Sequence, residues 1–480
     1  MYFWILCVGG FFCFITAMGI GSNDAANAFS TSVGSKSLTF KQATVLAIIF
    51  ETSGAILMGN HVSDTIRKGI SDIECFEDNP EALMYGCMWV LVSVSGWLFL
   101  ASYYELPVST THSCVGGMIG MTIAIVGSDC VIWYSYTDKF PYIGGVSGIV
   151  LSWFISPIFS GLISCGIFSS LRSFVLRKPY TSNRIIIFYP CLVSITLLIN
   201  CFFIIYKGAK GIGLHNLSLI ESLGYSFGIS IFGGLITIPL VPYIKKMVDN
   251  KFNTNNITEE GIIDNVVYNN DSIVNNTIEL NIKNNSQLKT ITYIHDNAEK
   301  FDDKLEETFK YLQIFSAICD SFSHGANDVA NAVGPFFTIY LIYTSDTKIT
   351  KKVDMGEDAY WILSLGGLGI SMGLLLYGKK IINALGTKLC KITASRGTCI
   401  ELGSALVIIT GSRLKIPLST THCQVGATVG VGLLEKNIHG INWFIILKTV
   451  SGWLSTCIIV GFTTGILVSQ GIYAPSLINE

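Results

Sequence analysis

Two polar motifs, each present twice and in the same order, constrain this chain more than any other feature. Residues 21–28 read GSNDAANA, and residues 325–332 read GANDVANA. Residues 106–112 read LPVSTTH, and residues 416–422 read IPLSTTH. Self-similarity of this kind indicates that one structural unit is repeated within the chain. The fold must therefore accommodate two copies of that unit.

Both motifs lie in strongly apolar surroundings. Half of the 480 residues are hydrophobic and 13% are charged, against about 25% charged in ordinary soluble domains. Many apolar runs are long enough to cross a bilayer by the criterion of about 20 residues. We predict an all-α polytopic membrane protein with about 10–12 transmembrane helices. No Lys or Arg precedes the first run, so we interpret it as a membrane helix and not as a cleaved signal peptide.

Composition divides the chain into four parts. Residues 1–140 hold the first pair of motifs and residues 311–480 hold the second, and we predict that each is one repeat. Residues 141–244 supply additional transmembrane helices. Residues 245–310 are rich in asparagine and acidic residues, which predicts a largely disordered linker. Its end, residues 297–310, is predicted to form a short charged helix that leads into the next span.

Basic residues favour the cytosolic side of a membrane protein. Two loops carry most of them: Arg172, Arg177, Lys178 and Arg184 in one, and Lys245, Lys246 and Lys251 in the other. Because two spans separate these loops, both are predicted to be cytosolic, the linker 245–310 included. Residues 207–217 would then lie outside, with Asn216 as a candidate glycosylation site. No basic block suggests a nucleic-acid partner.

The first motif combines the oxygen ligands that a hard cation prefers. Asn23 and Asn27 are four residues apart and share one helix face, and Asp24 lies between them. An aspartate at membrane depth costs about 2.5–3.5 kcal/mol unless it is paired, and the apolar segment around Asp24 has no Lys or Arg. A bound cation such as sodium is the economical partner. A helix N-cap is the alternative interpretation, but the second copy, Asn327, Asp328 and Asn331, argues against it.

The second motif predicts an oxyanion site. Pro107 and Pro417 suit the first turn of a helix. The hydroxyls that follow each proline would lie beside unpaired backbone N–H groups at the positive end of the helix dipole. They belong to Ser109, Thr110 and Thr111 in the first copy and to Ser419, Thr420 and Thr421 in the second. Ordinary helix capping is the alternative. His112 and His422 are predicted to pack or hydrogen-bond and not to carry protons.

Together the motifs, G-[SA]-N-D-x-A-N-A followed by P-x-S-T-T-H, resemble the signature of the inorganic phosphate transporter (PiT) family of sodium- or proton-coupled carriers. The similarity covers residues 2–135 and 311–470. It implies two repeats of inverted topology, each with a re-entrant or broken helix. It also implies a homodimer that imports inorganic phosphate with sodium by alternating access. A proton- or metal-coupled phosphate carrier, or a sulfate carrier, is the alternative.

The resemblance also assigns roles to single residues. Glu51 and Glu401 stand in segments similar to those of eukaryotic members, which implies that both acids take part in sodium coupling. Many of those members have a further glutamate near the position of Cys87, where this chain departs. Phosphate keeps protons near neutral pH, so it can also donate hydrogen bonds to Asp24 or Asp328. Those two carboxylates are therefore predicted to contact both sodium and phosphate.

Two other classes of protein deserve comparison with a transporter. Ser109, His112 and Asp24 contain the residue types of a hydrolytic triad, but an enzyme needs one asymmetric site, and every element here is doubled. A channel could use similar polar rings. The 14 cysteines are scattered without a CxxC pair, and we interpret them as buried, inert thiols. We therefore expect no enzyme activity and no cofactor beyond the transported sodium and phosphate, in a protein of the plasma membrane.

Overall fold

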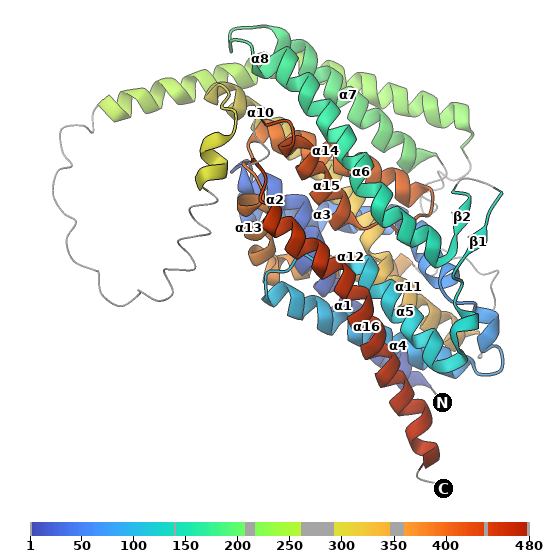
Figure 1. The fold of residues 1–480 in the computed structure, drawn as a ribbon. Helices are drawn as coiled ribbons and strands as arrows, with labels where there is room; N and C mark the ends of the chain where they lie inside the picture. Colours follow the sequence, from blue (N-terminus) through green and yellow to red (C-terminus); the bar gives the residue numbers. More distant parts are fainter. Residues whose placement is uncertain are drawn as a thin grey trace, which may run out of the picture.

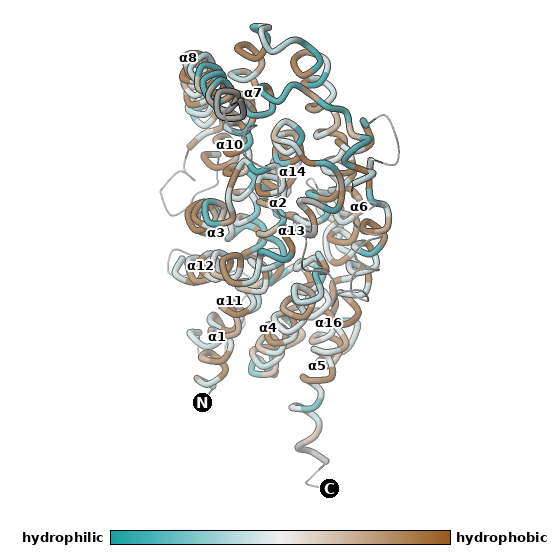
Figure 2. The backbone as a smooth tube through the Cα atoms, turned by 90° about the vertical axis from the view of Figure 1, so that its left-hand side faces the viewer, coloured by the Kyte–Doolittle hydropathy of each residue, from teal (hydrophilic) through white to brown (hydrophobic). Residues whose placement is uncertain are grey.

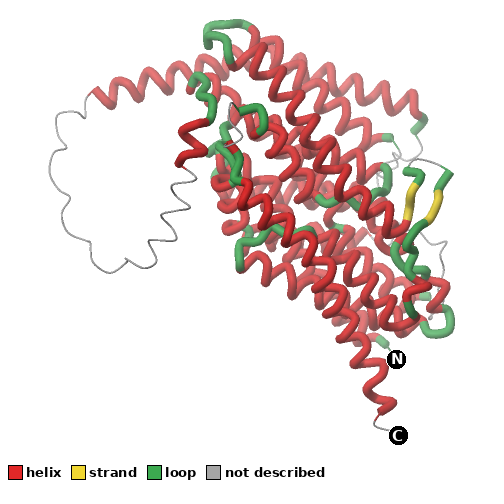
Figure 3. Tube along the Cα trace, viewed as in Figure 1, coloured by secondary structure: helices red, strands yellow, loops and turns green. Residues whose placement is uncertain are grey.

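The structure, a computed structural model, is almost entirely helical, with one two-stranded sheet (Figure 3). It describes residues 2–138, 141–206, 217–260, 292–345, 360–435 and 440–477.

The elements of the first half are α1 (Phe3–Ile20), a π-helical turn (Gly21–Ala25), α2 (Ala26–Gly34), α3 (Phe40–Gly69), α4 (Pro80–Tyr103), α5 (Thr110–Val126), β1 (Ser135–Tyr136), β2 (Ile143–Gly144), α6 (Gly145–Leu171), α7 (Arg184–Ile205) and α8 (Leu219–Glu260). The elements of the second half are α10 (Asp303–Asp328), α11 (Ala330–Thr344), α12 (Tyr360–Tyr377), α13 (Lys379–Lys388), α14 (Ala394–Arg413), α15 (Thr420–Gly432) and α16 (Trp443–Leu477). Strands β1 and β2 pair antiparallel.

The helices present apolar side chains outward, as an integral membrane protein requires. Ile187, Ile220 and Phe462 are 70% or more exposed, and apolar stretches dominate the helices (Figure 2). Within the described residues, eight helices are long and apolar enough to cross a membrane. The other helices are shorter or carry polar residues that are buried inside the bundle. The chain is therefore a polytopic, all-α membrane protein, as predicted.

The two halves pack in equivalent ways. A Cβ atom on Gly21 would lie 1.7 Å from the carbonyl oxygen of Ile370, so α12 can approach the first motif only because that residue is glycine. In the other half, a Cβ atom on Gly325 would lie 2.0 Å from the carbonyl oxygen of Glu51 on α3. The glycine of each polar motif thus admits a helix of the opposite half into backbone contact.

Two helical hairpins meet in the middle of the bundle. Helix α4 is followed by α5, and helix α14 is followed by α15, and the first turns of α5 and α15 touch: Thr111 Oγ1 donates to Leu418 O at 2.8 Å. The helices then run to opposite ends (Figure 1). The end of α5 lies beside the end of α16, where Tyr473 Oη donates to Ala124 O, while Leu434, just after α15, accepts from Arg172. This arrangement is the predicted pair of re-entrant hairpins with inverted topology.

Both ends of the predicted linker 245–310 are helical: residues 245–260 depart from the predicted disorder, whereas the short charged helix predicted for residues 297–310 is present from Asp303 onward. Helix α8 continues to Glu260, and α10 begins at Asp303. Two ion pairs hold these polar ends together, Lys251–Glu307 at 2.6 Å and Lys304–Asp249 at 2.7 Å. Residues 292–297 are also helical. The middle of the predicted linker, residues 261–291, lies outside the described residues, as do residues 207–216 and the candidate glycosylation site at Asn216.

The prediction that all cysteines are inert thiols is also wrong. Cys75 and Cys130 form a disulfide. Both lie in short loops, one before α4 and one after α5, where the backbones also pair: Asp72 N donates to Cys130 O at 2.8 Å. The prediction failed because it treated the cysteines of these loops like those inside the apolar runs.

Candidate functional site

Each half brings its Asn-Asp motif into the bundle through an interruption of the helix. In the first half, α1 gives way to the π-helical turn that contains Asn23 and Asp24. In the second half, α10 ends at Asp328 and α11 begins two residues later. Asp24 is 2% exposed and Asp328 is 1% exposed. The interruptions therefore place two carboxylates in the interior, next to backbone groups that lack the regular hydrogen bonds of an α-helix.

The Ser-Thr-Thr runs lie where α5 and α15 begin. Ser109 caps α5, and its Oγ accepts the backbone N–H of His112 at 3.3 Å. Ser419 caps α15 in the same way for His422, at 3.4 Å. The two serines thus stabilise helix starts, which is the alternative considered for them from the sequence. The threonines that follow remain available for other partners.

The prolines do not lie in the first helical turn, contrary to the prediction. Pro107 and Pro417 stand two residues before the capping serines, in the extended segments that lead into α5 and α15. Each segment follows a residue with positive φ, 55° at Glu105 and 60° at Lys415. The tight turn between the two arms of each hairpin leaves several residues before the next helix, and proline suits this extended stretch.

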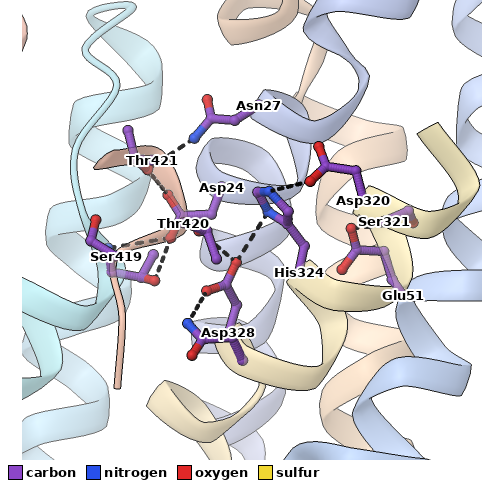
Figure 4. Close-up of polar contacts among 12 residues, drawn as sticks. Asp24, Asn27, Glu51, Asp320, Ser321, His324, Asp328, Ser419, Thr420 and Thr421 are labelled. Atoms are coloured by element: carbon purple, nitrogen blue, oxygen red, sulfur yellow. Dashed lines mark hydrogen bonds and ion pairs between the residues drawn. The ribbon is translucent and has the colours of Figure 1, made fainter. Parts of the chain in front are cut away.

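Threonine hydroxyls donate to both buried aspartates. Thr110 donates to Asp24 through its backbone N–H, at 3.3 Å, and through its hydroxyl. Thr420 Oγ1 donates to Asp328 Oδ2 at 2.9 Å, as the equivalent contact in the other half. Thr421 reaches across the halves and donates to Asp24 Oδ1 at 2.6 Å (Figure 4). The hydroxyls predicted to bind an anion and the carboxylates predicted to bind a cation are therefore in direct contact.

The asparagines at the end of the first motif also bridge the halves. Asn27 Nδ2 donates to Thr421 Oγ1 at 2.9 Å. Asn331 Nδ2 approaches Thr110 Oγ1 at 3.2 Å and Thr111 Oγ1 at 3.4 Å. Each asparagine therefore contacts the threonines of the opposite half. The side-chain oxygens of both asparagines are buried without a hydrogen-bond partner among the described residues, which leaves an acceptor free on each side of the site.

The asparagines that precede the aspartates hold the main chain. Asn23 donates to Leu106 O and accepts from Val108 N, both at 3.0 Å. Asn327 donates to Leu418 O at 2.8 Å. These amides fix the extended segments that lead into α5 and α15. Asn23 and Asn327 therefore have a structural role, besides the sodium coordination predicted for them.

Glu401 lies in a separate polar pocket. Thr31 donates to its carboxylate at 2.6 Å, Ser32 at 2.5 Å and Gln313 at 3.1 Å, and Ser316 donates as well. None of these four donors was identified from the sequence. The run of hydroxyl residues directly after the first motif, Ser30 to Ser32, was the available signal.

Glu51, on α3 of the first half, belongs to a third group, whose other members lie on α10 of the second half. Ser321 donates to it at 3.4 Å. Nearby, the ring of His324 lies between two buried carboxylates, 3.7 Å from Asp320 and 3.5 Å from Asp328 (Figure 4). The structure thus places Glu51 near Asp328 but outside the threonine cluster, and it brings His324, which was not singled out from the sequence, to 3.5 Å from Asp328.

The predicted residues therefore fall into two sets. Those brought together at the centre are Asp24, Asn27, Thr110, Thr111, Asp328, Asn331, Thr420 and Thr421. Those held apart from it, or engaged with the main chain, are Asn23, Glu51, Ser109, Asn327, Glu401 and Ser419. Of these, Asn327 also donates to Asp328 Oδ1 at 3.1 Å.

Comparison with known proteins agrees with this geometry. The model of the phosphate transporter family matches residues 20–464. The chain belongs to the phosphate transporter family. It is 29% identical to the phosphate-repressible phosphate permease of Neurospora crassa, over 98% of both chains. It is 26% identical to sodium-dependent phosphate transporter 1 of Mus musculus, over 97% of this chain and 95% of the mouse protein.

A solved structure of this family has the same fold. The chain superposes on a protein described as the sodium-dependent phosphate transporter with a TM-score of 0.77 and 30% sequence identity, over 99% of both chains. The match extends through the helices between the two polar motifs and not only over the motifs themselves. The relatives are named as permeases and transporters and not as enzymes.

Proposed function

We propose that this protein imports inorganic phosphate together with sodium by alternating access. One observation supports this most strongly: threonine hydroxyls from both halves converge on two buried aspartates. Anion donors and cation ligands therefore share one site. The names of the mouse relative and of the solved structure, both sodium-dependent phosphate transporters, point the same way.

The contacts between threonines and aspartates suggest how the two substrates are coupled. In the structure, Asp24 and Asp328 accept the hydroxyl hydrogens that a phosphate oxygen would need. Two carboxylates would also repel an anion. Sodium bound at the aspartates removes the repulsion and competes for their oxygens, which frees the hydroxyls of Thr110, Thr420 and Thr421 for phosphate.

This competition works in both directions. By linkage, if sodium raises the affinity for phosphate, phosphate raises the affinity for sodium by the same factor. Neutral hydroxyl donors hold phosphate without the deep trap of a lysine, so release on the far side remains feasible. The free side-chain oxygens of Asn27 and Asn331 are further candidates for sodium coordination or for accepting a hydrogen bond from phosphate.

Glu51 and Glu401 are proposed to take part from outside the central cluster. Glu401 accepts from the hydroxyls of Thr31 and Ser32 and from the amide nitrogen of Gln313, and hydroxyl oxygens are groups that a sodium ion accepts as ligands. Glu51 lies on the side of Asp328. A cation at either glutamate would lower the cost of their buried charge. No cofactor is required by this scheme.

We further propose that the end of the molecule carrying the basic loops faces the cytosol of a plasma-membrane protein. The basic residues of 171–184 and 245–251 gather at the end where α15 terminates. The disulfide between Cys75 and Cys130 lies at the opposite end. Disulfides persist in oxidising compartments and not in the cytosol, so both features favour the same orientation. A homodimer is proposed from the family resemblance alone.

Uptake into liposomes tests the function directly. Purified protein is reconstituted, and labelled phosphate uptake is followed with an inward sodium gradient and with an equal choline gradient, at two pH values. We expect uptake that requires sodium and is not competed by sulfate. Uptake driven by a proton gradient without sodium would reassign the acids to proton carriage. Folded protein without phosphate uptake under either gradient would contradict the proposal.

A further inference from the structure

Four aromatic rings from four helices pack together beside the Ser-Thr-Thr runs. His112 on α5 lies against Trp153 on α6, with ring centroids 3.5 Å apart, and His422 on α15 lies against Trp453 on α16, at 3.7 Å. The two histidine rings are 4.7 Å apart. Both histidines are buried, with 2% and 4% of their surface exposed.

Each histidine also hydrogen-bonds the main chain of the tryptophan on which it does not stack. His112 Nδ1 lies 3.0 Å from Trp453 O, and His422 Nδ1 lies 2.9 Å from Trp153 O. A carbonyl oxygen only accepts, so Nδ1 carries the hydrogen in both rings. Every histidine therefore contacts both tryptophans, one through the ring and one through the backbone, and α5, α6, α15 and α16 are joined in a closed set of contacts.

These contacts act on the residues proposed to bind phosphate. Thr111 and Thr421 directly precede the histidines in the first turns of their helices. Their hydroxyls reach the main chain of the opposite half, Thr111 to Leu418 O at 2.8 Å and Thr421 to Val108 O at 3.1 Å. A rotation of either helix start would move its threonine away from these positions.

The four rings also bury polar atoms for which the described residues offer no hydrogen-bond partner, which lowers the stability of the fold. Nε2 of both histidines and Nε1 of both tryptophans are buried without a hydrogen-bond partner among the described residues. Apolar rings of similar size would fill the same space without unpaired polar atoms, and unpaired buried groups are unfavourable. What an apolar ring cannot supply is the bond from Nδ1 to the carbonyl of the other half.

We propose that His112 and His422 are positioning residues, which set the helix starts of α5 and α15 against α6 and α16 so that the threonines meet phosphate. This inference rests on the proposed function and assigns the histidines no proton transfer. It requires the Nδ1 hydrogen bond and not only the ring.

The chain offers a matched pair of substitutions. In His112→Asn and His422→Asn, the side-chain amide retains a donor close to the position of Nδ1. In His112→Phe and His422→Phe, the ring remains and the donor is lost. Thermal unfolding of the purified protein is followed with sodium alone, and then with increasing phosphate at saturating sodium.

We expect the Phe variants to need about tenfold more phosphate for half of the stabilisation, as for loss of a hydrogen bond of moderate strength. The Asn variants are expected to stay close to the wild type. Stabilisation by sodium alone should not be lost, because the histidines do not contact the aspartates and sodium competes with the threonine hydroxyls for them. The double Phe variant should be little worse than either single variant, since one closed set of contacts is broken in each case.

Three results would overturn the inference: Phe variants that bind phosphate like the wild type, Asn variants as impaired as the Phe variants, or a parallel loss of stabilisation by sodium. If a Phe variant does not fold, Trp153→Leu and Trp453→Leu replace it, because they remove the stacking and keep both carbonyls, and they should show a smaller, equally phosphate-specific effect. A wild-type protein that neither binds nor transports phosphate would refute the proposed function and this inference with it.

Discussion

The hairpins α4–α5 and α14–α15 are alike at their tips, the turns between the two helices, and different at their bases, where the first helix begins and the second ends. At each tip a serine caps the second helix, and a threonine donates to the aspartate of the same half. At the bases the chemistry differs. A disulfide, Cys75–Cys130, joins the start of one hairpin to its end. In the other hairpin, Arg396 near the start of α14 pairs with Glu435 just after α15, at 2.5 Å.

The difference shows which part of a repeated unit is constrained by the substrate and which by its surroundings. The tips share one site, so both copies need the same groups. The bases lie at opposite ends of the bundle (Figure 1), and a disulfide is durable only where the compartment is oxidising. A buried ion pair closes the other hairpin without depending on redox conditions. Both hairpins are thus closed at their bases, one by a disulfide and the other by an ion pair.

The largest effect is expected at the tips, from Asp24→Asn and Asp328→Asn. Each change removes a buried carboxylate that is proposed to bind sodium, so sodium-driven phosphate uptake should fall by about a hundredfold or more, equivalent to about 2.7 kcal/mol or more. Uptake in liposomes measures this, with the amount of folded protein checked by gel filtration. Asp129→Asn, at a loop on the disulfide side, is the matched control and should transport normally.

If one of the two Asn variants kept full sodium-dependent uptake, the coupling scheme would be wrong. Equal losses would support equivalent tips. A clearly smaller loss for Asp328→Asn would instead point to its neighbours, because His324 lies 3.5 Å from Asp328 and Asp24 has Ile20 at the equivalent position of its own motif.

At the base of the α14–α15 hairpin, Arg396→Met should lower the free energy of unfolding by about 3–5 kcal/mol, because it leaves the buried carboxylate of Glu435 without its cationic partner. The side chains of the pair are 2% and 6% exposed, so the cost of an isolated charge applies in full. Thermal unfolding in detergent measures the loss. The double change Arg396→Met with Glu435→Met should recover most of it. A double variant as unstable as the single one would show that Arg396 acts mainly through its bond to Glu299 O.

The features of the fold and of the site that the sequence predicted are mainly those that occur in both halves of the chain. The duplicated motifs predicted two halves and a central cluster with Asp24, Asp328 and the threonines, and the family resemblance that they carry implied the re-entrant helices. Features present in one half only were missed. Gln313 and Ser316, which bind Glu401, belong to no repeated motif, and Cys75 and Cys130 have no counterpart in the second half.

Other errors arose because local propensity was overridden by contacts distant in sequence. The polar end of α8 has the composition of a linker, yet it is helical to Glu260, and Asp249 and Lys251 form ion pairs with α10. Ser109 and Ser419 carry the same hydroxyl group as the threonines. They cap their helices, and do not donate to the aspartates, because each stands directly before the first helical residue. Where a helix begins or ends depends on main-chain geometry, which the spacing of residues in the sequence does not determine.

At the other base, Cys75→Ser with Cys130→Ser should cost about 2–4 kcal/mol of stability, the usual range for a disulfide. The bond closes a long segment, since the two cysteines are 55 residues apart. Phosphate uptake at 25 °C should remain close to that of the wild type, because the tip contacts do not involve this loop. A membrane-impermeant reductant, applied to whole cells, should reproduce the loss of stability from outside. If it acts only on inverted vesicles, the proposed orientation is wrong.

The smallest effect is expected from single hydroxyls at the tips. Thr110→Val and Thr420→Val each remove one donor without changing the volume much, so the phosphate concentration for half-maximal uptake should rise about tenfold, or about 1.4 kcal/mol. Thr428→Val is the control, because Thr428 bonds only within its own helix, to Gln424 O. Similar shifts for the two variants would mean that both tips hold phosphate oxygens. A shift in only one of them would show that phosphate binds closer to that half, and that the other threonine donates only to its aspartate.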